Sequence, residues 1–475
     1  MNEKVKSEKR IPSVAESIIG LLLVSAAVLI GLKLGIGSQM ALFLGAIVAI
    51  LVALFFRVPW SEIQATFYKT MSDSLIPIVI LMIVGVTVGA WIIGGTVPSL
   101  MYFGLKLVSP KIILPLTFVL CAFMAVFTGT SFGSVATMGL ALTGVAMGMG
   151  MPVPMVVGAV VSGAWFGDKL SPMSDSTNLA SAMTGVNLYT PIGSMMWTTI
   201  PATIITIVIY TVIGLGYSTE NVDMSNINLM LTTLDETFHI SIIAIIPAIM
   251  MLVVSVLKIP AILGLSGVAV FSIVFAMLMQ GESFTAVMTA CYSGYKSATG
   301  VALVDTILTR GGLMSMMATV ALVLIAGIMG GSLKASGVMD VFVEKILKKF
   351  IKSGKSLVIT TMLYSYFILV ISGSQPLGVV MGGPTFKDAY DEMDIDRRVL
   401  SRALADTSTV GSPLVPWSVG AAYTMGVLGV TAAYVPYAFL CYIIPVFTVL
   451  TAVTGIGMWH SDGTPYWKKK NAAAN

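Results

Sequence analysis

Residues 167–178 read GDKLSPMSDSTN, a polar stretch set between long apolar runs. It contains two aspartates, Asp168 and Asp175, with Lys169 beside the first. A carboxylate at membrane depth costs at least ~2.5–3.5 kcal/mol, so it usually has a partner or a function there. Sodium binds oxygen ligands, and a proton competes with it for a buried negative charge. The stretch therefore predicts a site where a cation is exchanged for protons.

The rest of the chain has the composition of a membrane protein. Of its 475 residues 57% are hydrophobic and only 10% are charged, whereas soluble chains average roughly 25% charged residues. Apolar runs of about 18 or more residues recur, and ~20 helical residues at 1.5 Å each cross the hydrocarbon. We expect an all-α polytopic membrane protein, and we interpret the first run, 18–35, as a retained membrane helix rather than a signal peptide.

Twelve apolar runs are predicted to span the membrane. They are 18–35, 39–56, 75–95, 111–128, 153–167, 196–217, 238–257, 260–280, 311–331, 357–372, 398–425 and 435–457. The segment 218–237 has no lysine or arginine and is predicted to be an extracytoplasmic loop.

Several function classes are excluded by what the sequence lacks. Cys121, Cys291 and Cys441 lie far apart without a CxxC pair, and the two histidines are His239 and His460. A disulfide framework, a zinc site and a histidine metal site are therefore not expected. GxSxG, HExxH and a P-loop are absent, so an enzyme or an ATP-driven pump is not indicated, and no cofactor is expected besides a transported sodium ion. The lysine clusters are orientation signals and do not indicate nucleic-acid binding.

Polar interruptions of the apolar pattern occur in matching pairs. SPMSDSTNLASAMTGV (171–186) aligns without gaps on SPLVPWSVGAAYTMGV (412–427) with five identities, and TGTS (128–131) aligns on SGSQ (372–375). These matches predict an internal repeat. The Lys-rich segment 345–355 should be cytoplasmic, like both termini, and this placement predicts that the repeats are inverted. The side from which each hairpin enters the membrane stays open.

Oxygen-bearing side chains in the interruptions are candidate ligands for the cation. The first repeat supplies Thr130, Ser131, Ser171, Ser174, Thr177 and Asn178 beside Asp168 and Asp175. The second repeat supplies Ser374, Gln375, Thr407, Ser408 and Ser412 beside Asp406, the third aspartate predicted at membrane depth. For sodium itself, Asp168, Asp175 and Asn178 are the first choice. If so, Asp175→Asn is expected to abolish transport without loss of folded protein.

Lys169 has three interpretations that the residues alone do not separate. It neutralises Asp168 or Asp175 when sodium is absent, it attracts the carboxylate of an organic substrate, or it extends to the membrane interface.

The motif GDKLSPMSDSTNLA resembles the signature stretch of the NhaC family of sodium/proton antiporters, and TGTSFGS and ADTSTVGSPLVPWS also resemble that family's pattern. The resemblance implies a secondary transporter of the ion-transporter superfamily. It implies two inverted repeats, each with a re-entrant hairpin and a broken helix, an elevator motion and a homodimer. Some members exchange sodium for protons, whereas others resemble malate–lactate exchangers or carry amino acids.

The sequence thus leads to one main hypothesis and one alternative. The main one is sodium/proton exchange across the cytoplasmic membrane; the alternative is a sodium/proton-coupled carrier of a small carboxylate or an amino acid. The predicted organisation is an N-terminal tail with two membrane helices (1–69), a first repeat (70–217), a linker loop with connecting membrane helices (218–309), a second repeat (310–457) and a cytoplasmic tail (458–475).

Overall fold

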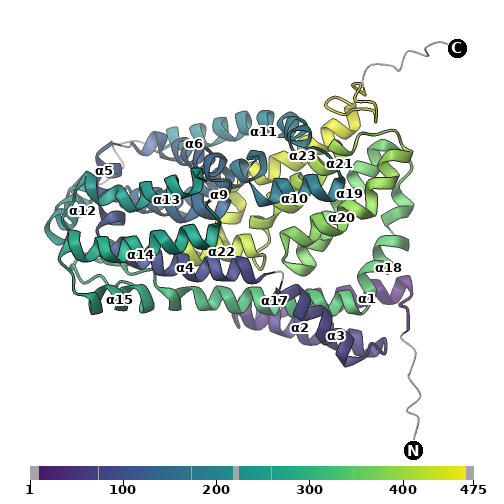
Figure 1. The fold of residues 1–475 in the computed structure, drawn as a ribbon, viewed down its shortest axis with the longest axis horizontal. Coiled ribbons are helices and arrows are strands. Elements are labelled where there is room, and N and C mark those ends of the chain that lie inside the picture. Colours follow the sequence, from purple (N-terminus) through teal and green to yellow (C-terminus); the bar gives the residue numbers. More distant parts are fainter. Residues whose placement is uncertain are drawn as a thin grey trace, which may run out of the picture.

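The computed structural model describes residues 10–72, 74–107, 109–172, 174–217, 224–257, 259–345 and 347–466. In these ranges the regular structure is helical, and most helices run along the long axis of the molecule (Figure 1). Six of the described helices are long and apolar enough to cross a membrane, or up to eight if each of two bent helix pairs is one span. These helices confirm the prediction of a helical protein with several membrane-spanning segments.

A first set of elements contains a bent helix pair, a hairpin, a broken helix and a long helix. The bent pair consists of α4 (Leu75–Ile93) and α5 (Thr96–Leu107). The first arm of the hairpin is α6 (Pro110–Thr128), and the second is one continuous helix made of α7 (Ser131–Ser134), the π-helical η1 (Val135–Gly139) and α8 (Leu140–Gly148). The broken helix consists of α9 (Val153–Leu170) and α10 (Asp175–Thr184), and the long helix is α11 (Tyr189–Leu215).

A second set of elements follows the same order later in the chain. The elements are α17 (Met317–Ala335) with α18 (Val338–Lys345), η5 (Leu347–Phe350), the hairpin α19 (Gly354–Ser372) and α20 (Gln375–Glu392), the broken helix α21 (Arg397–Leu404), η6 (Ala405–Thr409), η7 (Ser412–Leu414) and α22 (Val419–Leu428), then η8 (Ala432–Tyr437) and α23 (Phe439–Thr454).

The remaining elements precede and connect these two sets. They are α1 (Val14–Lys33), α2 (Ser38–Phe55), α3 (Trp60–Ser72), α12 (Met224–Thr237), η3 (Ile242–Ile245), α13 (Ile246–Val256), α14 (Ala261–Gln280), α15 (Phe284–Ser293), α16 (Ala302–Leu308) and η4 (Leu313–Met316).

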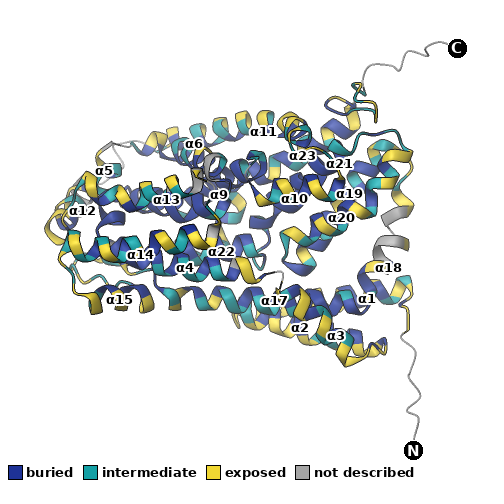
Figure 2. Ribbon diagram, viewed as in Figure 1, coloured by how far each residue is buried: buried dark blue, intermediate teal, exposed yellow. Residues whose placement is uncertain are grey.

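The outer helices carry many exposed residues (Figure 2), and a large share of these are apolar. Leu278 on α14 is 81% exposed and Val212 on α11 is 63% exposed. Water would disfavour such a large apolar surface, and lipid accommodates it. Inside, α6 packs against α9, and α10 packs against α20, so the first broken helix lies against the second hairpin. This packing brings the polar interruptions of the two sets into one region.

Two predictions about helix boundaries are wrong. The segment predicted as a loop over 218–237 forms helix α12 from Met224 on, because Ile227, Met230 and Leu234 lie on one face and are buried. The run 398–425 is not one helix, because the backbone becomes extended at Val415 and Ser418. The terminal lysine clusters that serve as orientation signals lie outside the described residues: Lys4, Lys6 and Lys9 near one end, and Lys468, Lys469 and Lys470 near the other. Residues 218–223 of the predicted loop also lie outside them.

Candidate functional site

The two hairpins have tips of the same design. The first helix of each ends at a glycine in the left-handed conformation, Gly129 with φ 69° and Gly373 with φ 65°. The next residue, Thr130 or Ser374, is extended and precedes the following helix. A side chain at a position with positive φ is strained, and glycine avoids this strain. The aligned pair TGTS and SGSQ therefore encodes the same reversal in both hairpins.

The break between α9 and α10 is held by local hydrogen bonds. The backbone is extended at Ser171 and Ser174, and the Ser174 hydroxyl accepts from the N–H of Ser176. The Asn178 amide donates to the carbonyls of Pro172 at 3.0 Å and Ser174 at 2.8 Å. Carbonyls at a helix break lose their helical partners, and the Asn178 side chain donates to the one at Pro172. The Ser174 carbonyl also accepts from the Asn178 backbone N–H at 3.0 Å. The side-chain amide nitrogen of Asn178 thus acts as a structural donor here.

Asp168 is the centre of a cluster of hydroxyl groups. The residue is only 7% exposed, and its carboxylate accepts from the hydroxyls of Ser131 at 3.1 Å, Ser176 at 3.4 Å and Ser174. Thr177 donates to the backbone carbonyls of Asp168 and Lys169. The first hairpin tip and both halves of the broken helix thus converge on one carboxylate, which supplies hard oxygens for a small cation.

A cavity of about 580 Å³ opens beside this cluster. Its polar wall includes both hairpin tips and the helix break: Gly129, Thr130, Ser131, Gly133, Asp168, Pro172, Asp175, Ser176, Ser374 and Gln375. Its apolar wall comes largely from other helices, among them Ile80 and Val84 on α4 and Leu265 and Val268 on α14. The cavity therefore lies between the interrupted helices and the helices around them.

The structure divides the predicted residues into those on the cavity and those away from it. Asp168, Asp175, Thr130, Ser131, Ser374 and Gln375 line it. The other predicted residues are not in its wall: Ser171, Ser174, Thr177, Asn178, Lys169, Asp406, Thr407, Ser408 and Ser412. Asp175 is exposed, whereas Asp168 is buried, so the two carboxylates occupy different environments.

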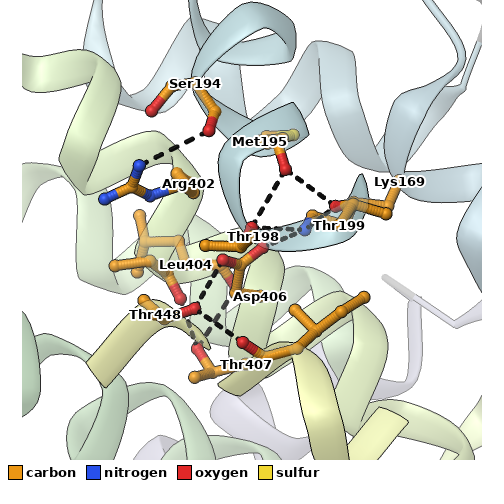
Figure 3. A network of polar contacts seen from close by, with 12 residues as sticks. Lys169, Ser194, Met195, Thr198, Thr199, Arg402, Leu404, Asp406, Thr407 and Thr448 are labelled. Atoms are coloured by element: carbon orange, nitrogen blue, oxygen red, sulfur yellow. Dashed lines mark hydrogen bonds and ion pairs between the residues drawn. The ribbon is translucent and has the colours of Figure 1, made fainter. Parts of the chain in front are cut away.

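Lys169 does not line the cavity and forms an ion pair with Asp406 (Figure 3). Both side chains are fully buried. The ammonium also donates to Thr199 at 2.5 Å and Thr198 at 3.2 Å on α11. The interpretation that Lys169 neutralises Asp168 or Asp175 is wrong for this structure, and so is the interpretation that it extends to the interface. Adjacent residues of a helix point in different directions, so Lys169 on α9 does not point the same way as Asp168. Its ammonium instead contacts α11 and Asp406 inside the protein.

Asp406 lies in a π-helical turn and belongs to a buried network that the sequence interpretation missed in part. Its second carboxylate oxygen accepts from Thr448 on α23 at 2.6 Å. One turn earlier, the buried Arg402 donates to the Gly457 carbonyl at 2.6 Å and to Thr451 at 3.0 Å. It also donates to the Ser194 carbonyl at 3.4 Å (Figure 3). A basic residue four positions before an aspartate, in an apolar run, was the signal that could have identified Arg402.

Hydroxyl groups predicted for the second repeat have partners within the second set of elements. Ser408 donates to the Gln375 carbonyl at 2.7 Å and thereby ties η6 to the second hairpin tip. Thr407 donates to the Ala403 carbonyl at 2.7 Å, and Ser412 contacts Ser418 at the second helix break. These side chains support the interrupted backbone, and of this group only Ser374 and Gln375 reach the cavity.

The sequence that forms this site matches a known protein family. A model described as the Na+/H+ antiporter family matches residues 163–456, a range that begins just before the first helix break. The chain belongs to this family. The match confirms the resemblance found in GDKLSPMSDSTNLA, and Asp168, Asp175 and Asp406 all lie within it.

Relatives in the Na+/H+ antiporter family span nearly the whole chain. The Na(+)/H(+) antiporter NhaC of Alkalihalophilus pseudofirmus is 34% identical over 418 residues, 87% of this chain and 90% of that protein. The malate-2H(+)/Na(+)-lactate antiporter of Bacillus subtilis is 33% identical and covers 95% and 97% of the two chains. The arginine/ornithine antiporter ArcD of Halobacterium salinarum is 31% identical and covers 97% and 96%.

Proposed function

We propose that this chain is a secondary active transporter that exchanges sodium ions for protons across the cytoplasmic membrane. The observation that carries the proposal is the Asp168 carboxylate, which is buried among the hydroxyls of Ser131, Ser174 and Ser176 at the edge of the cavity. Membership of the Na+/H+ antiporter family supports it.

The proposed chemistry follows from the cost of an enclosed charge. A bare carboxylate in a low-dielectric environment is unfavourable, so Asp168 holds either a proton or a cation when it crosses the barrier. Ser131 and Ser174 offer their hydroxyl oxygens to sodium and donate to the carboxylate when the ion is absent. Competition for one carboxylate makes the exchange obligatory. No enzymatic step and no resident cofactor is needed.

The shared order of elements supports the proposal of two inverted repeats, 70–217 and 310–457, with the linker 218–309 between them. The hairpins and broken helices are proposed to move as one body in an elevator motion. The helices that form the apolar cavity wall, α4 and α14 among them, are proposed to stay fixed. The exposed apolar faces of the outer helices are available to lipid and to the second subunit of the proposed homodimer.

The proposed orientation has both termini in the cytoplasm. The start of α1, helix α18 and the end of α23 lie towards the same end of the molecule, and α12 lies at the opposite end (Figure 1). The Lys-rich segment around α18 is then cytoplasmic, as the positive-inside rule requires.

A second candidate is a sodium/proton-coupled carrier of a small organic substrate. The observation that favours it is the size of the cavity, because about 580 Å³ exceeds what a sodium ion needs and falls within the range of small-molecule sites. Two relatives are named for organic substrates, malate and lactate in one case and arginine and ornithine in the other.

The decisive experiment uses purified protein in liposomes with a trapped pH dye. A pH gradient is imposed, and sodium chloride is added in the absence of any organic solute. Sodium-dependent collapse of the gradient, absent with sucrose of equal osmotic strength, supports sodium/proton exchange. If the gradient responds only after malate, lactate or an amino acid is added, the second candidate replaces the first.

A further inference from the structure

The charge of the cavity narrows the class of organic molecule that it accepts. Two carboxylates, Asp168 and Asp175, are part of its wall, and none of the described residues that line it is lysine, arginine or histidine. The nearest candidate, Lys169, is paired with Asp406 and hydrogen-bonded to two threonines outside the cavity. A dicarboxylate entering this space would meet the Asp175 carboxylate, and that of Asp168 whenever Asp168 holds neither a proton nor sodium. It would meet no cationic side chain among the described residues.

Helix N-termini bring partial positive charges to the cavity, but no cationic side chain. The helices that begin at Ser131, Gln375 and Asp175 all start there, and each end carries about half a positive charge that falls off within the first turn. Asp175 lies in the first turn of α10, so its own carboxylate opposes the partial charge of that helix end. The Asp168 carboxylate lies beside the start of α7, where it accepts from the Ser131 hydroxyl. Two of the three helix ends therefore already have a carboxylate next to them.

The two carboxylates differ in what they can bind. Asp168 is enclosed by serine hydroxyls and offers little room beyond a small ion. Asp175 is exposed at the first position of α10, and its carboxylate has no hydrogen-bond or ion-pair partner among the described residues. An unpaired carboxylate on a cavity wall suits a bulkier cation that keeps part of its hydration.

The remaining wall suits an organic body attached to that cation. Apolar side chains such as Val84 and Val268 line the space, together with Phe132 and Tyr423, whose rings stack with their centroids 4.3 Å apart. An ammonium or guanidinium group that reaches the face of either ring gains a cation–π attraction, which a carboxylate does not.

We propose that the cavity binds a small organic cation, an ammonium or guanidinium compound, through Asp175, and rejects dicarboxylates. This inference rests on the proposed transport function and names the substrate class of the same site. Within the second candidate function it favours a cationic amino acid or amine over malate.

The test measures ligand-dependent thermal stabilisation of the purified full-length protein in sodium-free detergent solution. The probes are butylammonium and L-lysine as cations, butanol as the uncharged match of the first, and L-malate as the dicarboxylate. We expect the two cations to raise the melting temperature in a saturable way, while butanol and malate leave it unchanged.

Variants assign the effect to Asp175. We expect Asp175→Asn to weaken butylammonium binding at least tenfold and Asp175→Glu to retain it. Asp235→Asn, an exposed charge change on α12, serves as the matched control and should bind normally. Size-exclusion profiles verify that each variant is folded. Stabilisation by malate, no stabilisation by either cation, or unchanged butylammonium binding in Asp175→Asn would overturn the proposal.

Sodium/proton exchange measured on the same preparation distinguishes failure of this inference from failure of the proposed transport function. Exchange without cation binding refutes only this inference. If the wild-type protein shows no sodium/proton exchange, the proposed function is refuted. The binding measurements then still test whether the cavity selects cations over dicarboxylates.

Discussion

Lys169 and Asp406 come from the two broken helices and form a fully buried ion pair with each other. Asp168, the immediate neighbour of Lys169, lies on the cavity instead. One pair of adjacent residues thus serves two purposes: Asp168 faces the space where ions arrive, and Lys169 ties the first broken helix to the second. The predictions below test these separate roles.

Removing the charge of Asp168 is expected to stop exchange. Asp168→Asn should lower the sodium-dependent proton flux in liposomes more than about tenfold, because the variant carries no charge for sodium to neutralise. Asp235→Asn should exchange at the wild-type rate. Near-normal flux in Asp168→Asn would remove this residue from the mechanism.

The hydroxyl of Ser131 is expected to set the apparent affinity for sodium. Hydrogen bonds to charged groups contribute ~1.5–3 kcal/mol, so Ser131→Ala should raise the sodium concentration for half-maximal flux about tenfold or more. Ser134→Ala is the matched control, because Ser134 lies on the same helix but donates to the Cys121 carbonyl at 2.7 Å. Equal shifts in the two variants would argue against a specific role for Ser131.

Breaking the buried pair from one side is expected to destabilise the protein. Lys169→Met leaves Asp406 uncompensated, which costs about 3–5 kcal/mol for a buried pair. Thermal unfolding in detergent should therefore show a large drop in melting temperature. The double variant Lys169→Met/Asp406→Leu removes both charges and should recover most of the loss. A double variant that is less stable than either single one would contradict this view of the pair.

The second hairpin tip depends on glycine at position 373. A Cβ atom there would lie 2.8 Å from the Trp417 carbonyl oxygen, and φ is +65°. Gly373→Ala should cost at least ~1–2 kcal/mol of folding stability, measured by thermal unfolding. Gly193→Ala, where a Cβ meets nothing within 4 Å, should be neutral or slightly stabilising. Similar losses in both variants would show that the tip conformation is not the cause.

The contact between α16 and the loop that precedes it should make stability depend on pH. Asp305 accepts from the Thr299 N–H at 2.8 Å and from the hydroxyls of Ser297 and Thr299, and these bonds hold the pKa of its carboxyl below the ordinary 3.8. Because the folded-state pKa is the lower one, the stabilisation is present above pH 3.8 and is lost as the pH falls through the folded pKa. The difference between the melting temperatures of wild type and Asp305→Asn should be largest above pH 3.8 and should narrow as the pH is lowered below that value. A difference that does not narrow as the pH falls below 3.8 would contradict this assignment.

The sequence by itself determined the helical membrane fold and the places where the helices are interrupted. Apolar runs must be helical in lipid, because each backbone polar group needs an internal partner. Gly129 and Gly373, followed by the extended residues Thr130 and Ser374, encode the hairpin tips through local backbone preferences. These signals are local, so they can be read without the fold, and the resemblance carried by GDKLSPMSDSTNLA is local too.

Only the tertiary structure decided which polar residues share a site. Asp168, Lys169 and Asp175 lie close together in sequence, but the direction of α9 and the break after it send them to a hydroxyl cluster, a buried ion pair and a cavity wall. The partners of Lys169 and Arg402 come from α11, η6 and α23, which are distant in the chain. Charge pairing across such distances depends on helix packing, and the spacing of residues within a motif does not specify it.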